Sequence, residues 1–246
     1  MHRGYHILVI NPGSTSTKLA LFRNNRELRA YTARHDARQL AAYHAVMDQE
    51  EMRLAEVRGF LARCARAAGG PRDPGAPRSM GAPQKPDAPP RLDAVAARGG
   101  LLRPIRGGVY QVNRDMLRDL RSGRYGEHAS NLGAVLGSRV GEEQGCLVFI
   151  VDPVVVDELD PAARLSGLPQ IPRRSIFHAL NQKAAAREAA VRLRREYERC
   201  NFIVAHLGGG ISVGAHRRGR VMDVNNALDG EGPFSPERSG GLPAGQ

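Results

Sequence analysis

Two turns rich in glycine and hydroxyl residues carry the side chains best suited to chemistry in this chain. The first turn, Asn11–Lys18, reads NPGSTSTK and combines an amide, a glycine, four hydroxyls and a lysine. The second, His206–Ser212, reads HLGGGIS and contains three consecutive glycines. Backbone N–H groups and hydroxyls in such turns face anions well. Two turns of this kind predict a site for a polyphosphate.

The first turn is not a Walker loop. It lacks the Gly-x-x-x-x-Gly-Lys spacing, and it stands between two apolar runs, whereas a Walker loop precedes a helix. We expect the two turns to bind phosphate through Asn11, Gly13, Ser14, Thr15, Ser16, Lys18, His206, Gly208, Gly209 and Gly210.

Each turn is predicted to join the strands of a hairpin. The flanking runs, such as His6–Ile10 and Phe202–Leu207, are short and rich in β-branched residues. A second turn follows in each copy, at Arg23–Asn25 and at Arg217–Gly219, and leads to a further extended stretch. The duplication indicates two related lobes.

Helices are predicted between the strands. Asp36–Ala68 reads as helical in two pieces, with Asp48 as an N-cap and Glu51 completing a capping box. In its second piece a stripe of apolar residues recurs at helical spacing, namely Leu54, Val57, Phe60, Leu61 and Cys64. Ser175–Arg199 reads as one long Ala-rich helix. Two further helices are expected at Asn113–Leu120 and Ser130–Val140, each capped by its first residue.

Strands at Leu92–Ala96 and Cys146–Val151 alternate with these helices, which favours an α/β fold. The expected domain boundary lies near Asp152, giving lobes 1–152 and 153–246. Residues 69–90 are rich in Gly, Pro, Ala and Arg, with almost no large apolar residues, and are predicted to be a disordered insert.

The formal net charge is +11, yet 33 of the 36 basic residues are arginine and aromatic residues make up only 5%. Nucleic-acid binding is typical of a basic stripe with interleaved aromatics. We therefore interpret the charge as a composition bias and expect no nucleic-acid partner. A basic nucleic-acid binder stays the most distant alternative.

No apolar run approaches the roughly 18 residues that a bilayer requires, so we expect no membrane association. The N-terminus shows no signal-peptide pattern. Three widely spaced cysteines, Cys64, Cys146 and Cys200, favour a reducing cytoplasm and neither zinc nor disulfides.

The turn Asn11–Lys18 resembles the first phosphate motif of the acetokinase family, the carboxylate kinases of the actin/hexokinase/Hsp70 fold. Pro12, where acetate kinases have Ala, points to the butyrate kinases. Further segments resemble the family in order and spacing: Arg98–Leu102, Glu127–Gly133, Phe149–Glu158, Phe177–Lys183, His206–Ser212 and Asn226–Gly240.

The resemblance implies an α/β protein with two actin-like (ribonuclease H-like) lobes. It also implies a phosphoryl transfer between ATP and butyrate, giving butyryl phosphate and ADP. Arg98 and Arg238 resemble the family's active-site arginines, and a guanidinium can hold a carboxylate or phosphoryl group with two hydrogen bonds. His178 resembles the histidine that contacts the transferring group, and His128 a supporting one.

The same resemblance assigns a magnesium ion to Asp152 and Asn11, with Asp152 among the catalytic residues. Family members continue for roughly a hundred residues past the arginine motif, so we expect a second lobe that is truncated and lacks the adenosine-binding segment. Three alternatives stay open, namely a kinase for isobutyrate or another branched-chain acid, an acetate kinase, and an inactive remnant. A homo-oligomer also stays open.

Overall fold

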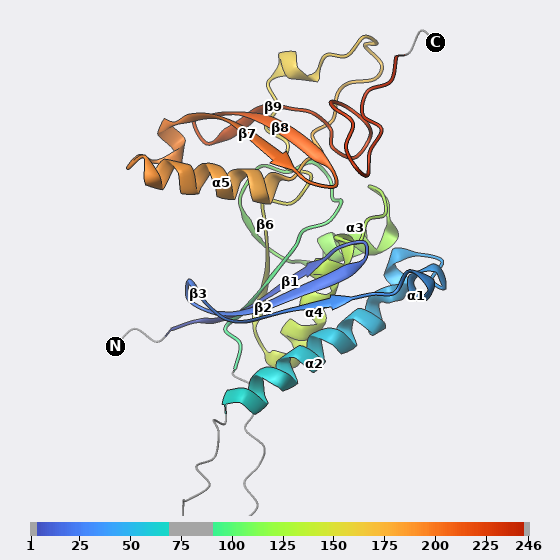
Figure 1. Ribbon diagram of the computed structural model, residues 1–246, viewed down its shortest axis with the longest axis vertical. Coiled ribbons are helices and arrows are strands. Elements are labelled where there is room, and N and C mark those ends of the chain that lie inside the picture. The colour runs from blue at the N-terminus through green and yellow to red at the C-terminus, as the bar shows by residue number, and fades with distance from the viewer. Residues whose placement is uncertain (1–3, 69–90, 244–246) are drawn as a thin grey trace, which may run out of the picture. The chain divides into compact units, whose positions relative to one another are not determined.

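A computed structural model describes residues 4–68 and 91–243, and these residues form two compact units (Figure 1). The first unit comprises Met1–Gly100 and Tyr110–Ile150, and the second Leu101–Val109 and Val151–Gln246. The sequence predicts one boundary between the two lobes, near Asp152. The second unit also includes residues 101–109, because Ile105 pairs with Val156. The predicted insert at 69–90 lies outside the described residues.

A six-stranded sheet with the order β3-β2-β1-β4-β6-β5 is the centre of the first unit. Its strands are β1 (His6–Pro12), β2 (Ser16–Arg23), β3 (Arg26–Arg34), β4 (Ala94–Ala97), β5 (Val109–Gln111) and β6 (Leu147–Val151). Strands β1, β2 and β3 pair antiparallel, whereas β1 with β4 and β4 with β6 pair parallel. The predicted hairpin is confirmed, as are the two later strands of this sheet.

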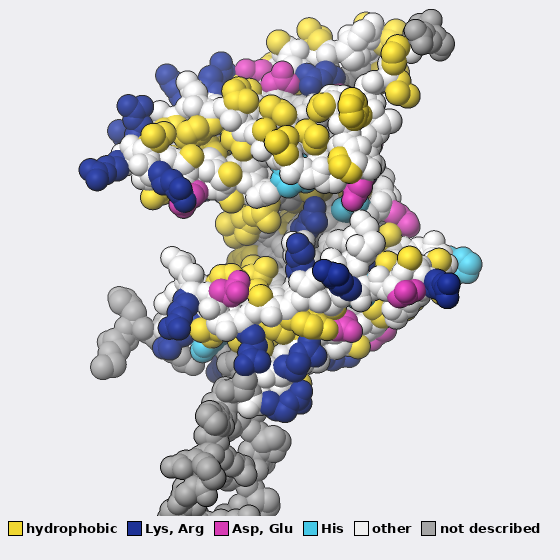
Figure 2. All heavy atoms as spheres, in the orientation of Figure 1, with side chains coloured by type: hydrophobic (Ala, Val, Ile, Leu, Met, Phe, Trp, Pro, Cys, Tyr) yellow, Lys and Arg dark blue, Asp and Glu magenta, His cyan; other side chains and the backbone are white. Residues whose placement is uncertain are grey.

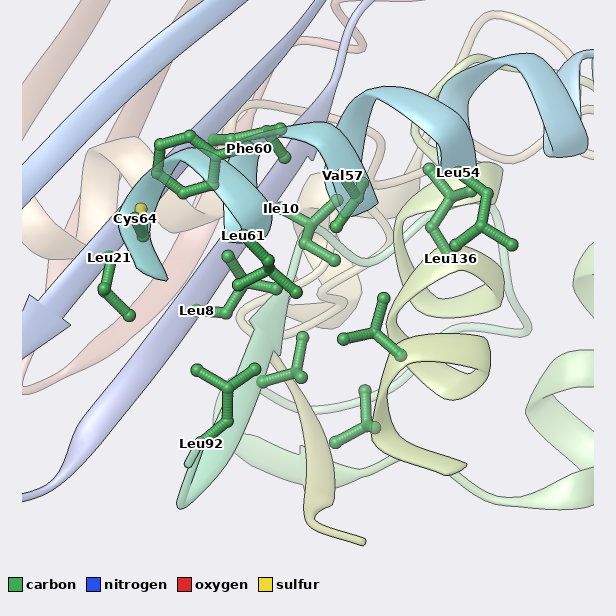
Figure 3. Packing of buried hydrophobic residues seen from close by; sticks show 14 of the residues in the cluster. Leu8, Ile10, Leu21, Leu54, Val57, Phe60, Leu61, Cys64, Leu92 and Leu136 are labelled. Atoms are coloured by element: carbon green, nitrogen blue, oxygen red, sulfur yellow. The ribbon is translucent and has the colours of Figure 1, made fainter. Parts of the chain in front are cut away.

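Helices α2 and α4 pack on this sheet around one apolar core (Figure 3). The helices of the unit are α1 (Ala37–Ala41), α2 (Glu50–Ala68), α3 (Arg114–Ser122) and α4 (Asn131–Gln144), with a 3-10 helix at Val46–Gln49. The predicted helical stripe of α2 is confirmed, since its members are all buried in this core: Leu54, Val57, Phe60, Leu61 and Cys64.

Glycines at four-residue spacing let α4 approach the strands closely. Gly133, Gly137 and Gly141 share one helix face, and an ideal Cβ at Gly137 would lie 2.9 Å from a methyl carbon of Val148. A Cβ at Gly133 would meet the carbonyl oxygen of Arg98. This contact fixes the loop that carries Arg98 against the start of α4.

The structure confirms one of three predicted capping hydrogen bonds. Asn113 accepts a hydrogen bond from Met116 N at 2.9 Å and caps α3, as expected. Asp48 was wrongly predicted as a cap, because it lies inside the 3-10 helix and accepts instead from Ala45 N. Ser130 stands before α4 but makes no capping bond, since its hydroxyl is paired with His128.

The second unit contains a three-stranded antiparallel sheet with the order β7-β8-β9. Its elements are α5 (Ala179–Arg192), β7 (Asn201–Leu207), β8 (Ile211–Arg217) and β9 (Arg220–Val224), with 3-10 helices at Pro161–Arg164 and Tyr197–Arg199. The second predicted hairpin is therefore confirmed. In both copies the register also shifts where the second strand pairs with the third, at Leu21/Phe22 in β2 and at Ala215/His216 in β8.

The prediction of one helix over Ser175–Arg199 was wrong at both ends. Ser175 and Phe177 bond to the backbone of Val156 and Val154, and the helix begins only at Ala179. The helix ends at Arg192, and Arg194 adopts a left-handed conformation with φ of 55°.

One face of this sheet packs against α5, whereas the other carries exposed apolar side chains. Ala186 and Ala190 of α5 cluster with Tyr197 and Cys200. Ile203 and Leu207 of β7 are 75% and 73% exposed. Figure 2 shows hydrophobic side chains gathered in the region of β7 and β8, and basic side chains scattered over both units on the face that it displays. Among the described helices, none is long and apolar enough to cross a bilayer.

Candidate functional site

The first turn lies at the end of the β1–β2 hairpin. Asn11 pairs with Lys18 across the strands, and Gly13 N donates to Ser16 O at 2.7 Å. Ser14, Thr15 and Lys18 are exposed, and Ser16 is half-buried. Hydroxyls and an ammonium group are therefore available to an anion at this turn.

A buried arginine donates hydrogen bonds to the residues of this turn. The sequence analysis did not predict it as a site residue. Arg53 of α2 is fully buried. Its Nη1 donates to Ser16 O at 3.1 Å and to Thr17 Oγ1 at 2.9 Å, and its Nη2 donates to Ser14 O at 3.3 Å. Gln49 Oε1 accepts from both Nε and Nη2. These four acceptors are all neutral, so a positive charge lies next to the turn.

Arg98 lies beside the first residue of the turn. Its backbone N donates to Ile10 O at 2.9 Å, and its Nη1 is 3.4 Å from Asn11 Oδ1. Burial lowers the pKa of the Arg98 guanidinium. A partly desolvated cation of this kind gains more from a bound anion than a solvated one does.

His128 precedes α4, and its ring is held by Ser130. The backbone N–H of Ser130 donates to His128 Nδ1 at 3.1 Å, and the Ser130 hydroxyl lies 2.7 Å from the same nitrogen. Because a backbone N–H can only donate, Nδ1 is the acceptor and a neutral His128 carries its proton on Nε2.

The second turn brings His178 and His206 together in the second unit. Their rings stack with centroids 3.8 Å apart and planes 10° apart. Asn181 Nδ2 lies 2.7 Å from His206 Nδ1, and Ser212 Oγ lies 2.9 Å from His178 Nδ1. An ideal Cβ at Gly210 would be 3.4 Å from His178 Cε1. Two predicted site residues from separate motifs thus share one cluster with the glycine turn.

The Arg238 segment also reaches this turn. Gly209 O accepts from Glu237 N at 3.0 Å and from Ser235 Oγ at 2.6 Å. The Glu237 carboxylate lies so close that an ideal Cβ at Gly209 would be 2.6 Å from its Oε1. Arg238 is half-buried and donates to Glu237 O at 2.8 Å. A carboxylate therefore faces the turn that was predicted to hold phosphate.

Asp152 is engaged by two donors and is closed to solvent. Its Oδ1 accepts from Gly108 N and its Oδ2 from Arg187 Nη1, both at 2.8 Å, and its side chain is 0% exposed. Asp152 itself has a left-handed φ of 39°. Both carboxylate oxygens are thus occupied, so Asp152 does not fit a magnesium ion or its water in this arrangement. Within the described residues, no group of three or more His, Cys, Asp or Glu forms a metal site.

Three curated relatives match almost the whole chain. They are Butyrate kinase 2 of Clostridium acetobutylicum, 50% identical, and the probable butyrate kinases of Listeria innocua and Coprothermobacter proteolyticus, each 52% identical. The matches cover 97–98% of this chain and 61–62% of the relatives. The chain is homologous to the butyrate kinases. No protein-family model matches it.

Solved structures agree on the fold. A Porphyromonas gingivalis acetate kinase superposes with a TM-score of 0.67 and a Francisella tularensis propionate kinase with 0.61, each at 17% identity. Both matches cover 98% of this chain and 62% of the solved chain. The predicted α/β fold of the acetokinase type is confirmed over this span.

Three residues with a place near the candidate site were not predicted, namely Arg53, Gln182 and Arg187. Each acts through a contact with a segment that is distant in sequence, such as the bonds from Arg53 to the first turn 36–39 residues away. Any sequence signal for Arg53 and Arg187 is weak, because 33 arginines make each single arginine unremarkable.

Proposed function

We propose that this chain acts in phosphoryl transfer between ATP and butyrate, with butyryl phosphate and ADP as the other pair. The observation that carries the proposal is the partly buried Arg98 beside Asn11 at the first turn, in a chain 50–52% identical to butyrate kinases. The transition state of this reaction spreads negative charge over phosphoryl oxygens, so positioned donors and cations do most of the catalysis.

The first unit would bind phosphate groups of ATP through its turn. Gly13 and the hydroxyls of Ser14, Thr15 and Ser16 offer donors. Lys18 adds an exposed cation, and Arg53 adds a buried positive charge next to the turn. Arg98 would hold the carboxylate or the transferring phosphoryl group with its planar donors. His128, protonated on Nε2, would support it with a neutral donor.

The second unit would contact the transferring group through His178 and Arg238. Their placement at the turn of Gly208, Gly209 and Gly210 supports this assignment, as does the stacked ring of His206. Magnesium is typical of ATP-dependent kinases, and Asn11 would be its candidate ligand. Asp152 offers no accessible oxygen, so we assign no step to the ion.

Substrate size is the open choice among the family reactions. One methylene changes binding by only about 1–3 kcal/mol, so neighbouring acids compete. Isobutyrate and acetate are the alternative substrates.

The cysteines bear on the location of the protein. All three are free, and Cys64 and Cys200 are buried, which supports a cytoplasmic location.

The test is capture of acyl phosphate by hydroxylamine. The 246-residue chain is incubated with ATP, magnesium and butyrate, isobutyrate or acetate, beside Arg98→Ala. We expect most hydroxamate from butyrate and none above background from the variant. Thermal unfolding with and without ATP and magnesium runs in parallel. No hydroxamate together with no shift in the unfolding temperature would reject the proposal in favour of an inactive remnant.

A further inference from the structure

A continuous line of buried polar side chains runs behind His178 in the second unit. Tyr197 OH lies 2.7 Å from His216 Nδ1, and His216 Nε2 lies 3.0 Å from Gln182 Oε1. Gln182 Nε2 lies 2.8 Å from Ser212 Oγ, which in turn lies 2.9 Å from His178 Nδ1. Tyr197, Gln182, Ser212 and His216 are all buried.

The backbone sets the direction of these hydrogen bonds. Gln182 Nε2 also lies 3.0 Å from Ser212 O, a carbonyl oxygen that can only accept. The amide nitrogen of Gln182 must therefore face Ser212, and its oxygen must face His216. It follows that His216 Nε2 carries a proton and donates to Gln182. His216 Nδ1 then accepts from the Tyr197 hydroxyl.

The same direction reaches His178. Ser212 Oγ accepts from Gln182, and because Ser212 is fully buried its hydroxyl proton needs an acceptor. Among the described residues, the acceptor within reach of that proton is His178 Nδ1. We propose that Gln182 and Ser212 are positioning residues that hold His178 neutral with its proton on Nε2, whereas His216 and Tyr197 complete the buried network behind them. In this tautomer Nε2 carries the proton and has no nucleophilic lone pair.

Two further observations support this assignment. Burial, followed by the charge of Lys183, lowers the pKa of His216 to about 4, so His216 stays neutral and keeps one donor and one acceptor. The parallel stack of His178 on His206 restricts rotation of the His178 ring. A donor fixed in this way suits a phosphoryl oxygen, and that role rests on the proposed function.

Nitrogen NMR of the histidine rings tests the inference without any assay of activity. In the 246-residue chain labelled with 15N-histidine, two-bond proton–nitrogen correlations distinguish a protonated from an unprotonated ring nitrogen, and His178→Gln identifies the signals of His178. We expect an unprotonated Nδ1 and a protonated Nε2 at neutral pH. A proton on Nδ1 of the unaltered chain would overturn the inference.

Variants test which residues fix the tautomer. In Gln182→Glu the carboxylate accepts from the Ser212 hydroxyl, which reverses the bond to His178, so we expect a proton on Nδ1. Ser212→Ala removes the donor, so we expect a mixture of the two tautomers and a loss of the single His178 signal pattern. Tyr197→Phe is the matched control, because Ser212 O still orients Gln182. It should lower the unfolding temperature and leave His178 unchanged.

Unchanged His178 signals in both Gln182→Glu and Ser212→Ala would also overturn the inference. The outcome is separable from that of the proposed function. Hydroxamate formation by a chain with the proton on Nδ1 rejects the tautomer assignment alone. Absence of hydroxamate and of nucleotide stabilisation in a chain with the proton on Nε2 rejects the proposed function alone.

Discussion

Arg53 Nη1 lies 2.9 Å from Thr17 Oγ1, and neither side chain is exposed to solvent. The guanidinium thereby links α2 to the first turn, and each of its hydrogen bonds described above goes to a neutral acceptor. Burial of a charge without an opposite charge costs free energy, so a buried arginine here indicates a role other than filling the core. We infer that the turn depends on Arg53 for both its shape and its positive potential.

Replacement of Arg53 by Met should lower stability by on the order of 3 kcal/mol, because the carbonyl groups of Ser14 and Ser16 lose their donor. It should also weaken the binding of inorganic phosphate, followed by titration with chemical-shift detection. Arg58→Met on the same helix is the matched control, since Arg58 forms only a surface ion pair with Glu143. Equal phosphate affinity in the two variants would contradict the role given to Arg53.

The Lys183–Glu158 ion pair is the deepest in the described part of the second unit. Nζ lies 2.7 Å from Oε2, and the side chains are only 3% and 8% exposed. Glu158 also accepts from Gly107 N and Val221 N. Burial alone would raise the pKa of Glu158, but the bond from Lys183 and those amides outweigh it and lower the pKa.

Lys183→Met should therefore destabilise the chain by about 3–5 kcal/mol, because it leaves a buried carboxylate without its partner. Urea unfolding measures the loss. Arg217→Met, which removes the exposed ion pair with Asp160, should cost less than about 1 kcal/mol. Similar losses in the two variants would show that the buried pair is no more important than a surface one.

Sequence patterns predicted the local parts of this fold well. Short apolar runs rich in β-branched residues, together with glycine-rich turns, located both hairpins. Helical spacing located the buried stripe of α2. These signals need only neighbouring residues. They did not predict the Asp152–Arg187 pair or the His178–His206 stack, which join residues 35 and 28 positions apart. Such contacts depend on how the elements pack.

The end of α5 shows a second reason for failure. The N–H of Arg195 bonds to Ala190 O and that of Arg194 to Val191 O, which is the pattern of a Schellman motif. Glycine usually marks the left-handed position, yet Arg194 occupies it with φ of 55°. The sequence therefore lacked the usual stop signal, and the predicted helix ran on to Arg199.

Arg194→Gly should accordingly stabilise the chain by roughly 1 kcal/mol, since glycine adopts a left-handed conformation without steric cost. Arg192→Gly, two residues earlier and inside the helix, should destabilise it by about 1 kcal/mol. Thermal unfolding of the two variants gives the comparison. A loss of stability in Arg194→Gly would mean that the Arg194 side chain contributes more than its backbone strain costs.

Stability should fall as the pH is lowered from 6.5 towards 4, because of His216. Its folded pKa of about 4 lies below the unfolded value near 6.5, so protons bind the unfolded chain more tightly. The contribution is complete above pH 6.5 and is lost through this interval, to a total of about 3 kcal/mol. Burial and the charge of Arg53 lower the pKa of His35 as well, and this acts in the same direction.

Denaturant unfolding at several pH values checks this expectation. In His216→Gln the slope of stability against pH over this interval should become shallower, with the His35 contribution left. An unchanged slope would place the acid sensitivity elsewhere.

The carboxylate of Glu237 lies against Gly209 of the second turn. Two negative groups about 4 Å apart in water repel by about 1 kcal/mol. Glu237→Gln should therefore raise the affinity of the chain for inorganic phosphate by about fivefold at low salt, and by less at high salt as the charges are screened. The measurement is a phosphate titration at two ionic strengths.

Glu188→Gln makes the same change of charge on the exposed side of α5, where Glu188 pairs with Arg192, and it serves as the control. If both variants gain affinity equally, the effect is one of net charge and the turn is not involved. If neither gains, phosphate does not approach Gly209, and the glycines of the second turn have only a packing role beside His178.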